Sequence, residues 1–238
     1  MEDYGQFLER INSFEKQEME LPNEDFSVNP SLKKKVDDQN CFRPFFGDTV
    51  AFDLDSDTKK KVEGIVDVLY TQAGECFCER LRGDTFHITL HDLSNSPSLS
   101  EAAEEVFVNE LRIIDAVKRA NIGCEQLTMQ SNNVFNMVGT SLCLGVKPKG
   151  ESDYKKLMKL YSIIDEVKSL PYPFTPHITL AYYNCRAFSR ESAECLTRAV
   201  NIFNKEPFEF TVSTDKLYYQ KFTDMNTYVN IFPLIRMF

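Results

Sequence analysis

The chain has 238 residues, of which 42% are apolar and 26% charged, a composition typical of a soluble globular protein. Its 27 basic and 36 acidic side chains give a formal charge of −9, which excludes a protein that coats nucleic acid through bulk positive charge. The acidity is uneven, because residues 1–25 carry a net charge of −6 and the remaining residues only −3. A local anion-binding pocket in the body of the protein therefore remains compatible with the composition.

The cysteines and the apolar runs indicate the cellular compartment of the protein. The seven cysteines are odd in number and form no Cys-x-x-Cys pair, so we interpret them as free thiols in a reducing cytoplasm. The first residues lack the apolar stretch of a secretory signal. The longest uncharged run, 127–146, is rich in Gln, Ser, Asn and Thr and is no membrane span.

The first 43 residues are predicted to form a helix and an irregular acidic arm. Apolar residues recur at helical spacing over residues 4–14. Residues 20–46 contain three prolines and the triplet Lys33-Lys34-Lys35, which we interpret as a solvated turn. We take residues 1–43 as a separate N-terminal segment that caps the cleft, shields a strand edge, binds a partner or packs on the outside of the core. Residues 44–238 are the main domain.

From Gly47 onward, strands and helices alternate. The spacing of apolar residues predicts the fold class α+β, with antiparallel sheets that carry helices on one face. Ser98 and Glu101 have the spacing of a capping box at a helix start. The expected strands are 49–54, 84–91, 124–130, 133–138, 140–147, 174–183, 208–213, 215–222 and 227–233, and the expected helices are 57–72, 98–119, 152–169 and 189–204.

One tetrapeptide, His-Ile-Thr-Leu, occurs at 87–90 and again at 177–180, and it holds two of the three histidines. Because alternate residues of a strand point to one face, His87 and Thr89 share a face while their apolar neighbours face the core. His177 and Thr179 repeat this arrangement. Two such strands laid together would gather two imidazoles and two hydroxyls around one cavity.

This set of groups suits acid–base chemistry on a phosphodiester. One imidazole can act as a base while the other, protonated, acts as an acid near neutral pH. Hydroxyls can donate hydrogen bonds to the phosphate oxygens. The arrangement needs no metal and no cofactor, and the residues do not tell which histidine is acid and which is base.

The paired motif resembles the two-histidine (2H) phosphoesterase superfamily, which includes LigT-like 2′-5′ RNA ligases and cyclic phosphodiesterases. Pro-Phe-Thr-Pro-His-Ile-Thr-Leu-Ala-Tyr, at 173–182, is similar to the second motif of that family. The resemblance covers about residues 44–235. It implies a bilobal fold with pseudo-two-fold symmetry around a central cleft, with His87 and His177 as the acid–base pair and Thr89 and Thr179 as phosphate ligands.

Three further residues are candidate substrate contacts. His91 shares the face of His87 if its strand continues, although an exposed strand end is the alternative. Tyr183 is placed on the face of His177, where it would stack on a base or touch a phosphate, or else only pack. Arg43 stands near a predicted strand end and is a candidate phosphate contact. His87-x-x-x-His91 has the spacing of a zinc helix, but Ile88 stands where the glutamate is required, so no metal is expected.

The sequence thus predicts a cytoplasmic, monomeric, metal-independent phosphodiesterase. Its expected partner is a 2′,3′-cyclic or 2′-5′-linked nucleotide or an RNA end, with neither a DNA duplex nor a membrane. The alternatives are a non-catalytic nucleotide- or RNA-binding module that keeps the pocket, an RNA-end ligase, and a metal-dependent hydrolase that uses the three histidines.

Overall fold

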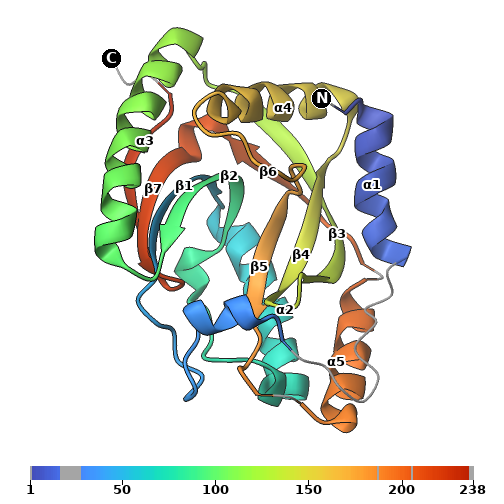
Figure 1. Ribbon diagram of the computed structural model, residues 1–238. Coiled ribbons are helices and arrows are strands. Elements are labelled where there is room, and N and C mark those ends of the chain that lie inside the picture. The colour runs from blue at the N-terminus through green and yellow to red at the C-terminus, as the bar shows by residue number, and fades with distance from the viewer. Residues whose placement is uncertain (1, 17–27, 187, 205, 236–238) are drawn as a thin grey trace.

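Two four-stranded antiparallel sheets form the centre of the molecule (Figure 1). The computed structural model describes residues 2–16, 28–186, 188–204 and 206–235; residues 17–27 of the predicted arm lie outside this range. The first sheet has the order β2-β1-β7-β8 and the second the order β5-β4-β3-β6. The strands are β1 (Phe46–Asp53), β2 (His87–Ser96), β3 (Gln126–Met137), β4 (Ser141–Pro148), β5 (His177–Tyr182), β6 (Glu209–Ser213), β7 (Leu217–Asp224) and β8 (Thr227–Pro233).

The two sheets share one plan, which confirms the expected α+β bilobal fold. In each sheet a motif strand lies at an edge and pairs with the strand that precedes it along the chain, β2 with β1 and β5 with β4. A helix connects the strands of each pair. The two motif edges, β2 and β5, contact each other, so they bring the halves of the chain together.

Four of the helices pack in two pairs, each with one helix from the N-terminal half of the chain and one from the C-terminal half (Figure 1). The described helices are α1 (Tyr4–Lys16), α2 (Ser56–Ala73), α3 (Leu99–Ala120), α4 (Glu151–Asp165) and α5 (Arg190–Phe203). Helix α2 packs against α5, and α3 packs against α4. Because each pair joins one helix from either half of the chain, the halves are held together behind the sheets as well as at the motif edges.

Amphipathic patterning explains why these segments are helices. In α2 the apolar residues Val62, Ile65, Val66 and Leu69 are buried, and the acidic residues between them, Glu63 and Asp67, face solvent. Burial of such a side chain contributes roughly 1.5–3 kcal/mol, so this face fixes the helix against the core. In the described part of the chain, no helix is long and apolar enough to cross a lipid bilayer.

The predicted capping box at α3 is wrong in its hydrogen bonds. Ser98 occupies the N-cap position, but its side chain makes no cap hydrogen bond. The Glu101 carboxylate instead accepts the hydroxyl of Ser96 at 2.6 Å, and the Ser96 oxygen accepts the backbone N–H of Ser98 at 3.0 Å. Ser96 therefore links the N-cap backbone to Glu101, and the side chain of Ser98 does not cap the first turn.

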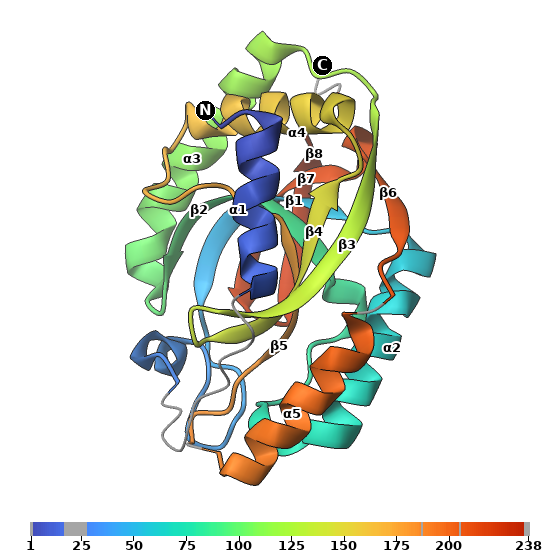
Figure 2. The same cartoon turned by 90° about the vertical axis from the view of Figure 1, so that its right-hand side faces the viewer.

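The described part of the N-terminal segment packs on the main domain. Helix α1 lies along β3 and β4 (Figure 2) and buries Phe7 and Ile11 in the core. A short 3-10 helix, Pro30–Lys34, follows and buries Leu32, while Val36 after it is buried as well. The described residues of this segment therefore pack against the core, and two of their side chains also reach the functional site.

Candidate active site

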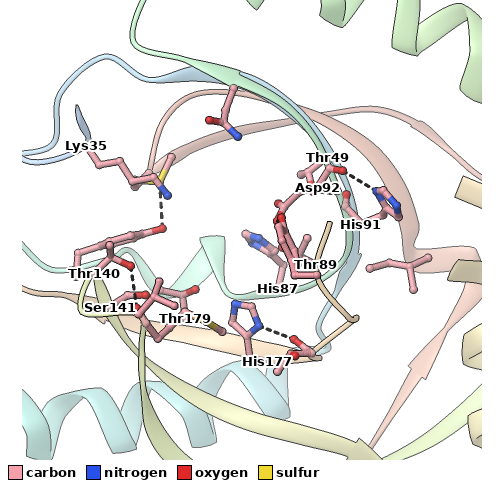
Figure 3. A pocket seen from close by; sticks show the side chains of 18 of the residues that line it. Lys35, Thr49, His87, Thr89, His91, Asp92, Thr140, Ser141, His177 and Thr179 are labelled. Atoms are coloured by element: carbon pink, nitrogen blue, oxygen red, sulfur yellow. Dashed lines mark hydrogen bonds between the residues drawn. The ribbon is translucent and has the colours of Figure 1, made fainter. Parts of the chain in front are cut away.

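A cavity of about 900 Å³ lies where the two motif strands meet. Its walls come from β2, β5, the β3–β4 turn, the loop that leads into β5, and the N-terminal segment. Figure 3 shows the two motif imidazoles close to each other in this pocket. All four residues expected at the site line it, namely His87, Thr89, His177 and Thr179.

The same backbone contact orients both motif imidazoles. Nδ1 of His87 lies 2.7 Å from the carbonyl oxygen of Thr85, and Nδ1 of His177 lies 2.8 Å from that of Thr175. Because a carbonyl oxygen only accepts, Nδ1 of each ring carries the hydrogen. Among the described residues, no hydrogen bond occupies Nε2 of either ring. Nε2 is therefore the atom of each ring that is left to take or give a proton.

Burial sets the charge of these rings. It lowers the pKa of His87, and the positive charge of a protonated His177 lowers it further. Burial likewise lowers the pKa of His177, while its bond to the Thr175 carbonyl opposes the shift. Both pKa values fall below the ordinary 6.5, so both rings are mostly neutral at pH 7.

The two threonines place hydroxyls beside the rings. Thr89 and Thr179 are half-buried, each two residues beyond its histidine on the same face of its strand. The Thr179 hydroxyl is 3.9 Å from the thiol of Cys143, which burial keeps protonated by raising its pKa to about 11. The hydroxyls can therefore donate to an anion placed between the strands.

His91 does not extend the series, which corrects its expected position. Thr89 pairs with Ala51 and His91 with Val50, so Leu90 is an extra, bulged residue without a partner in β1. The bulge turns His91 inward, where the side chain is fully buried although it borders the cavity. Its Nδ1 contacts the carbonyl of Asp92 at 2.6 Å and its Nε2 contacts Asp165 at 3.2 Å. Both ring nitrogens are thus engaged by the protein.

The second motif strand, β5, has its bulge at the residue that matches Leu90, and this changes the expected position of Tyr183. Thr179 pairs with Cys143 and Ala181 with Leu142, which leaves Leu180 as the extra residue. Tyr183 is consequently turned into the core, fully buried and stacked on Phe77 at 6.0 Å between ring centroids. The cavity is lined instead by Tyr182, as it is by Asp92 in the first strand. Each of these side chains stands five residues after its histidine.

Arg43 is exposed and does not line the cavity, so the expected contact is not made. The cations that do line it are Arg10 of α1 and Lys35, which follows the 3-10 helix. The prediction that the lysine triplet is a solvated turn is correct for Lys33 and Lys34, which are exposed, and wrong for Lys35. A period of three along a tight turn buries one lysine and exposes its two neighbours.

The loop before β5 supplies wall residues that sequence patterning missed. Tyr172, half exposed, donates its hydroxyl to Asp92 at 3.3 Å. Arg10 holds the loop from the other side, because it donates to the carbonyl of Phe174 at 2.8 Å and to the hydroxyl of Thr175 at 3.1 Å. The sequence did contain a signal for Thr175, because Thr-x-His-Ile-Thr-Leu occurs both at 85–90 and at 175–180.

The described residues do not gather a set of metal ligands at this site. Across the described ranges, no group of three or more His, Cys, Asp and Glu side chains is placed to hold a metal ion. Of the three histidines, His91 has both ring nitrogens engaged by the protein. The metal-dependent alternative therefore lacks a donor cluster in this part of the chain.

Comparison with known proteins gives matches in structure alone. Neither a protein-family profile nor a curated protein sequence matches the chain. A solved structure of ATU0111, a conserved protein of unknown function from Agrobacterium tumefaciens, matches with a TM-score of 0.61 and 14% identity, over 88% of this chain and 94% of that one. This match shows that the two chains share a fold.

Two further solved structures match at a lower score. Escherichia coli LigT in complex with 3′-AMP has a TM-score of 0.47 at 16% identity, and a structure described as a phosphoesterase has 0.47 at 19% identity. Each match covers 80% of this chain and 95% of the other.

Proposed function

We propose that the protein is a metal-independent phosphodiesterase of the 2H type, acting on a 2′,3′-cyclic or 2′-5′-linked nucleotide or an RNA end. One observation carries the proposal. His87 and His177 present Nε2 to one cavity, each with Nδ1 hydrogen-bonded to the carbonyl two residues earlier. A module that only binds nucleotides has no need for two imidazoles held in the same tautomer.

The geometry supports an in-line hydrolysis of a cyclic phosphate. Nε2 of one neutral ring accepts a proton from water, and the water oxygen forms a bond to phosphorus. The bond from phosphorus to the 2′ or 3′ oxygen breaks, and Nε2–H of the other, protonated ring donates its proton to that oxygen. Thr89 and Thr179 donate hydrogen bonds to the two non-bridging oxygens, where charge accumulates.

The first test measures turnover with metals removed. The protein is incubated in excess EDTA with adenosine 2′,3′-cyclic phosphate, with a 2′-5′-linked dinucleotide, and with a short RNA that ends in a 2′,3′-cyclic phosphate. We expect hydrolysis of at least one substrate at an unchanged rate. Activity that disappears with EDTA and returns with added metal would establish the metal-dependent alternative instead.

Histidine variants test the assignment of the site. We expect His87→Ala and His177→Ala each to lower kcat by about 10²–10⁴-fold, the usual contribution of a general acid or base. His91→Gln, which removes the third histidine, is the matched control and should keep the activity. Tight binding of these substrates without turnover in the unaltered protein would overturn the proposal in favour of a binding module, and RNA end joining would identify a ligase.

A further inference from the structure

Lys35 enters the cavity from the N-terminal segment, outside the part of the chain that resembles the 2H family. Its Nζ lies 5.2 Å from the ring centroids of both Phe45 and Tyr182, and the side chain is half-buried. The residues Leu32 and Val36 on either side of it are fully buried, so the backbone of Lys35 is fixed. Its position therefore belongs to the folded core rather than to a solvated tail.

A second contact ties this segment to the rim of the cavity. The backbone N–H of Asn29 donates to the carbonyl of Gly139 at 2.9 Å, and the Asn29 side-chain amide donates to that of Val138 at 3.1 Å. Val138 and Gly139 form the β3–β4 turn with positive φ angles of 45° and 72°. A β-branched residue rarely adopts such an angle, so the turn is held in place by its neighbours. The segment and the rim thus form one rigid edge.

Among the described residues, Lys35 forms no ion pair, and the carboxylate of Asp92 acts on its charge only from beyond ion-pair distance. The other cation of the wall, Arg10, forms two hydrogen bonds with Glu2 at 2.6 and 2.8 Å. No acidic side chain described by the structure comes within 4.0 Å of the Lys35 ammonium, and burial lowers the pKa of Lys35. A half-buried, unpaired cation is unfavourable unless an anion joins it. The site is therefore prepared for a negatively charged group of a ligand.

Polar side chains stand at both ends of a cavity whose walls are mostly apolar. Figure 3 shows Lys35 reaching in from the side of Thr140 and Ser141, while Asp92 stands on the other side of the two imidazoles. The motif threonines and imidazoles already supply the donors that one phosphodiester needs. At about 900 Å³ the cavity is at the upper end of pockets for small molecules, about 300–1,000 Å³, so it has room for a second group.

We propose that Lys35 binds a second phosphate of the substrate, separate from the phosphodiester between the two histidines. This inference rests on the proposed function and narrows it to nucleotides that carry a further phosphate, such as a 5′-phosphate on a 2′,3′-cyclic nucleotide. The second phosphate lies toward Lys35, Thr140 and Ser141. The uncharged donors of the ribose or base lie toward Asp92, whose carboxylate accepts hydrogen bonds.

The kinetic test compares two substrates that differ by one phosphate. They are adenosine 2′,3′-cyclic phosphate with and without a 5′-phosphate. Lys35→Met removes the charge but keeps an unbranched chain against the two rings. We expect it to lower kcat/KM about tenfold to hundredfold for the 5′-phosphorylated substrate and to leave the other nearly unchanged. Lys34→Met, at the exposed neighbour, is the matched control and should change neither.

Two kinetic outcomes would contradict the inference. An equal loss on both substrates would place Lys35 at the scissile phosphate or at His177. No loss on either would remove Lys35 from substrate binding altogether.

A binding measurement separates this inference from the proposed function. Calorimetry compares adenosine 2′,5′-bisphosphate with 2′-AMP, neither of which requires turnover. The unaltered protein should prefer the bisphosphate by about tenfold or more, and Lys35→Met should abolish that preference. An unchanged preference in Lys35→Met would refute the role of Lys35 whatever the enzyme does, whereas a lost preference without hydrolysis would uphold it and refute the phosphodiesterase.

Discussion

At the scale of single residues, the motif histidines are oriented by backbone rather than by a carboxylate. The acceptors of the two Nδ1–H groups are the carbonyls of Thr85 and Thr175, each two residues before its ring. A backbone carbonyl adds no charge to the site, so burial dominates and the pKa of each histidine is lowered. A buried carboxylate in the same place would have raised those pKa values.

These pKa shifts predict an acidic optimum. The active form has one protonated and one neutral imidazole, so its population is largest between the two pKa values of the pair. Because both values lie below 6.5, we expect kcat/KM to peak below pH 6.5 and to fall on either side. Initial rates from pH 4 to 9 with a cyclic nucleotide measure this. A flat profile, or a maximum above pH 8, would contradict paired roles for these histidines.

The threonine hydroxyls make a separate prediction. Thr89→Val and Thr179→Val keep the shape of the side chain and remove one donor to the phosphate. A hydrogen bond to a charged group is worth about 1.5–3 kcal/mol, so each change should lower kcat/KM by about tenfold to hundredfold. Thr211→Val, on the exposed face of an edge strand, is the control. Equal rates for all three variants would show that these hydroxyls do not contact the phosphate.

At the scale of elements, alternation predicts a motif strand only up to its bulge. His87 and Thr89 share a face as expected, and so do His177 and Thr179. Beyond Leu90 and Leu180 the facing residues change, because an extra residue in a strand reverses the side on which every later side chain lies. No composition marks a leucine as bulged. The sequence therefore did not point to Asp92 and Tyr182, which line the cavity, and it did point to Tyr183, which is buried in the core.

Helix boundaries were more accessible, and they carry a prediction for stability. Asp55 caps α2, with its carboxylate accepting the backbone N–H groups of Asp57 and Thr58 at 2.9 and 2.8 Å. We expect Asp55→Ala to lower the free energy of unfolding by about 1 kcal/mol. Asp57→Ala removes the same charge from an exposed position two residues away and should cost only a few tenths. Denaturant unfolding distinguishes them, and equal losses would attribute the effect to charge alone.

At the scale of the whole molecule, the order of elements along the chain was predictable but their assembly was not. Periodicity located the helices and most strands of 44–238 to within about five residues, but it divided β3 into two strands, 124–130 and 133–138. It did not indicate that α2 would pack with α5 and α3 with α4, because each apolar helix face fits many partners. Nor did it show that the N-terminal segment would supply Arg10 and Lys35 to the cavity, since that depends on contacts far apart in sequence.

The buried carboxylate of Asp48 joins strands β1, β2 and β7 to helix α3. Asp48 of β1 is 1% exposed and accepts the backbone N–H of Ser94 in β2 at 2.8 Å. It also accepts the Asn109 amide of α3 at 3.3 Å and the hydroxyl of Tyr219 in β7 at 3.0 Å. Burial raises the pKa of Asp48 to about 6, although these hydrogen bonds oppose the shift.

This carboxylate predicts how stability depends on pH. Between pH 4 and 6 the folded protein keeps a proton on Asp48 that the unfolded chain releases, so raising the pH through this window lowers the free energy of unfolding. A shift of about two pH units corresponds to about 3 kcal/mol. The loss should be complete above pH 6 and should not continue toward pH 8.

Asp48→Asn isolates this effect, because the amide stays neutral at every pH. Its oxygen can keep the bond from Ser94, and its N–H₂ can donate to Tyr219, whose hydroxyl also reaches the carbonyl of Val106 at 3.2 Å. Urea unfolding of both proteins at pH 4 and 7 gives the difference between their pH responses, from which other carboxylates cancel. We expect the variant to gain about 3 kcal/mol relative to the unaltered protein over this range, and Asp215→Asn, at an exposed carboxylate, to gain none. Parallel responses in all three proteins would mean that the pKa of Asp48 is not raised in the folded state, because its hydrogen bonds offset the cost of burial.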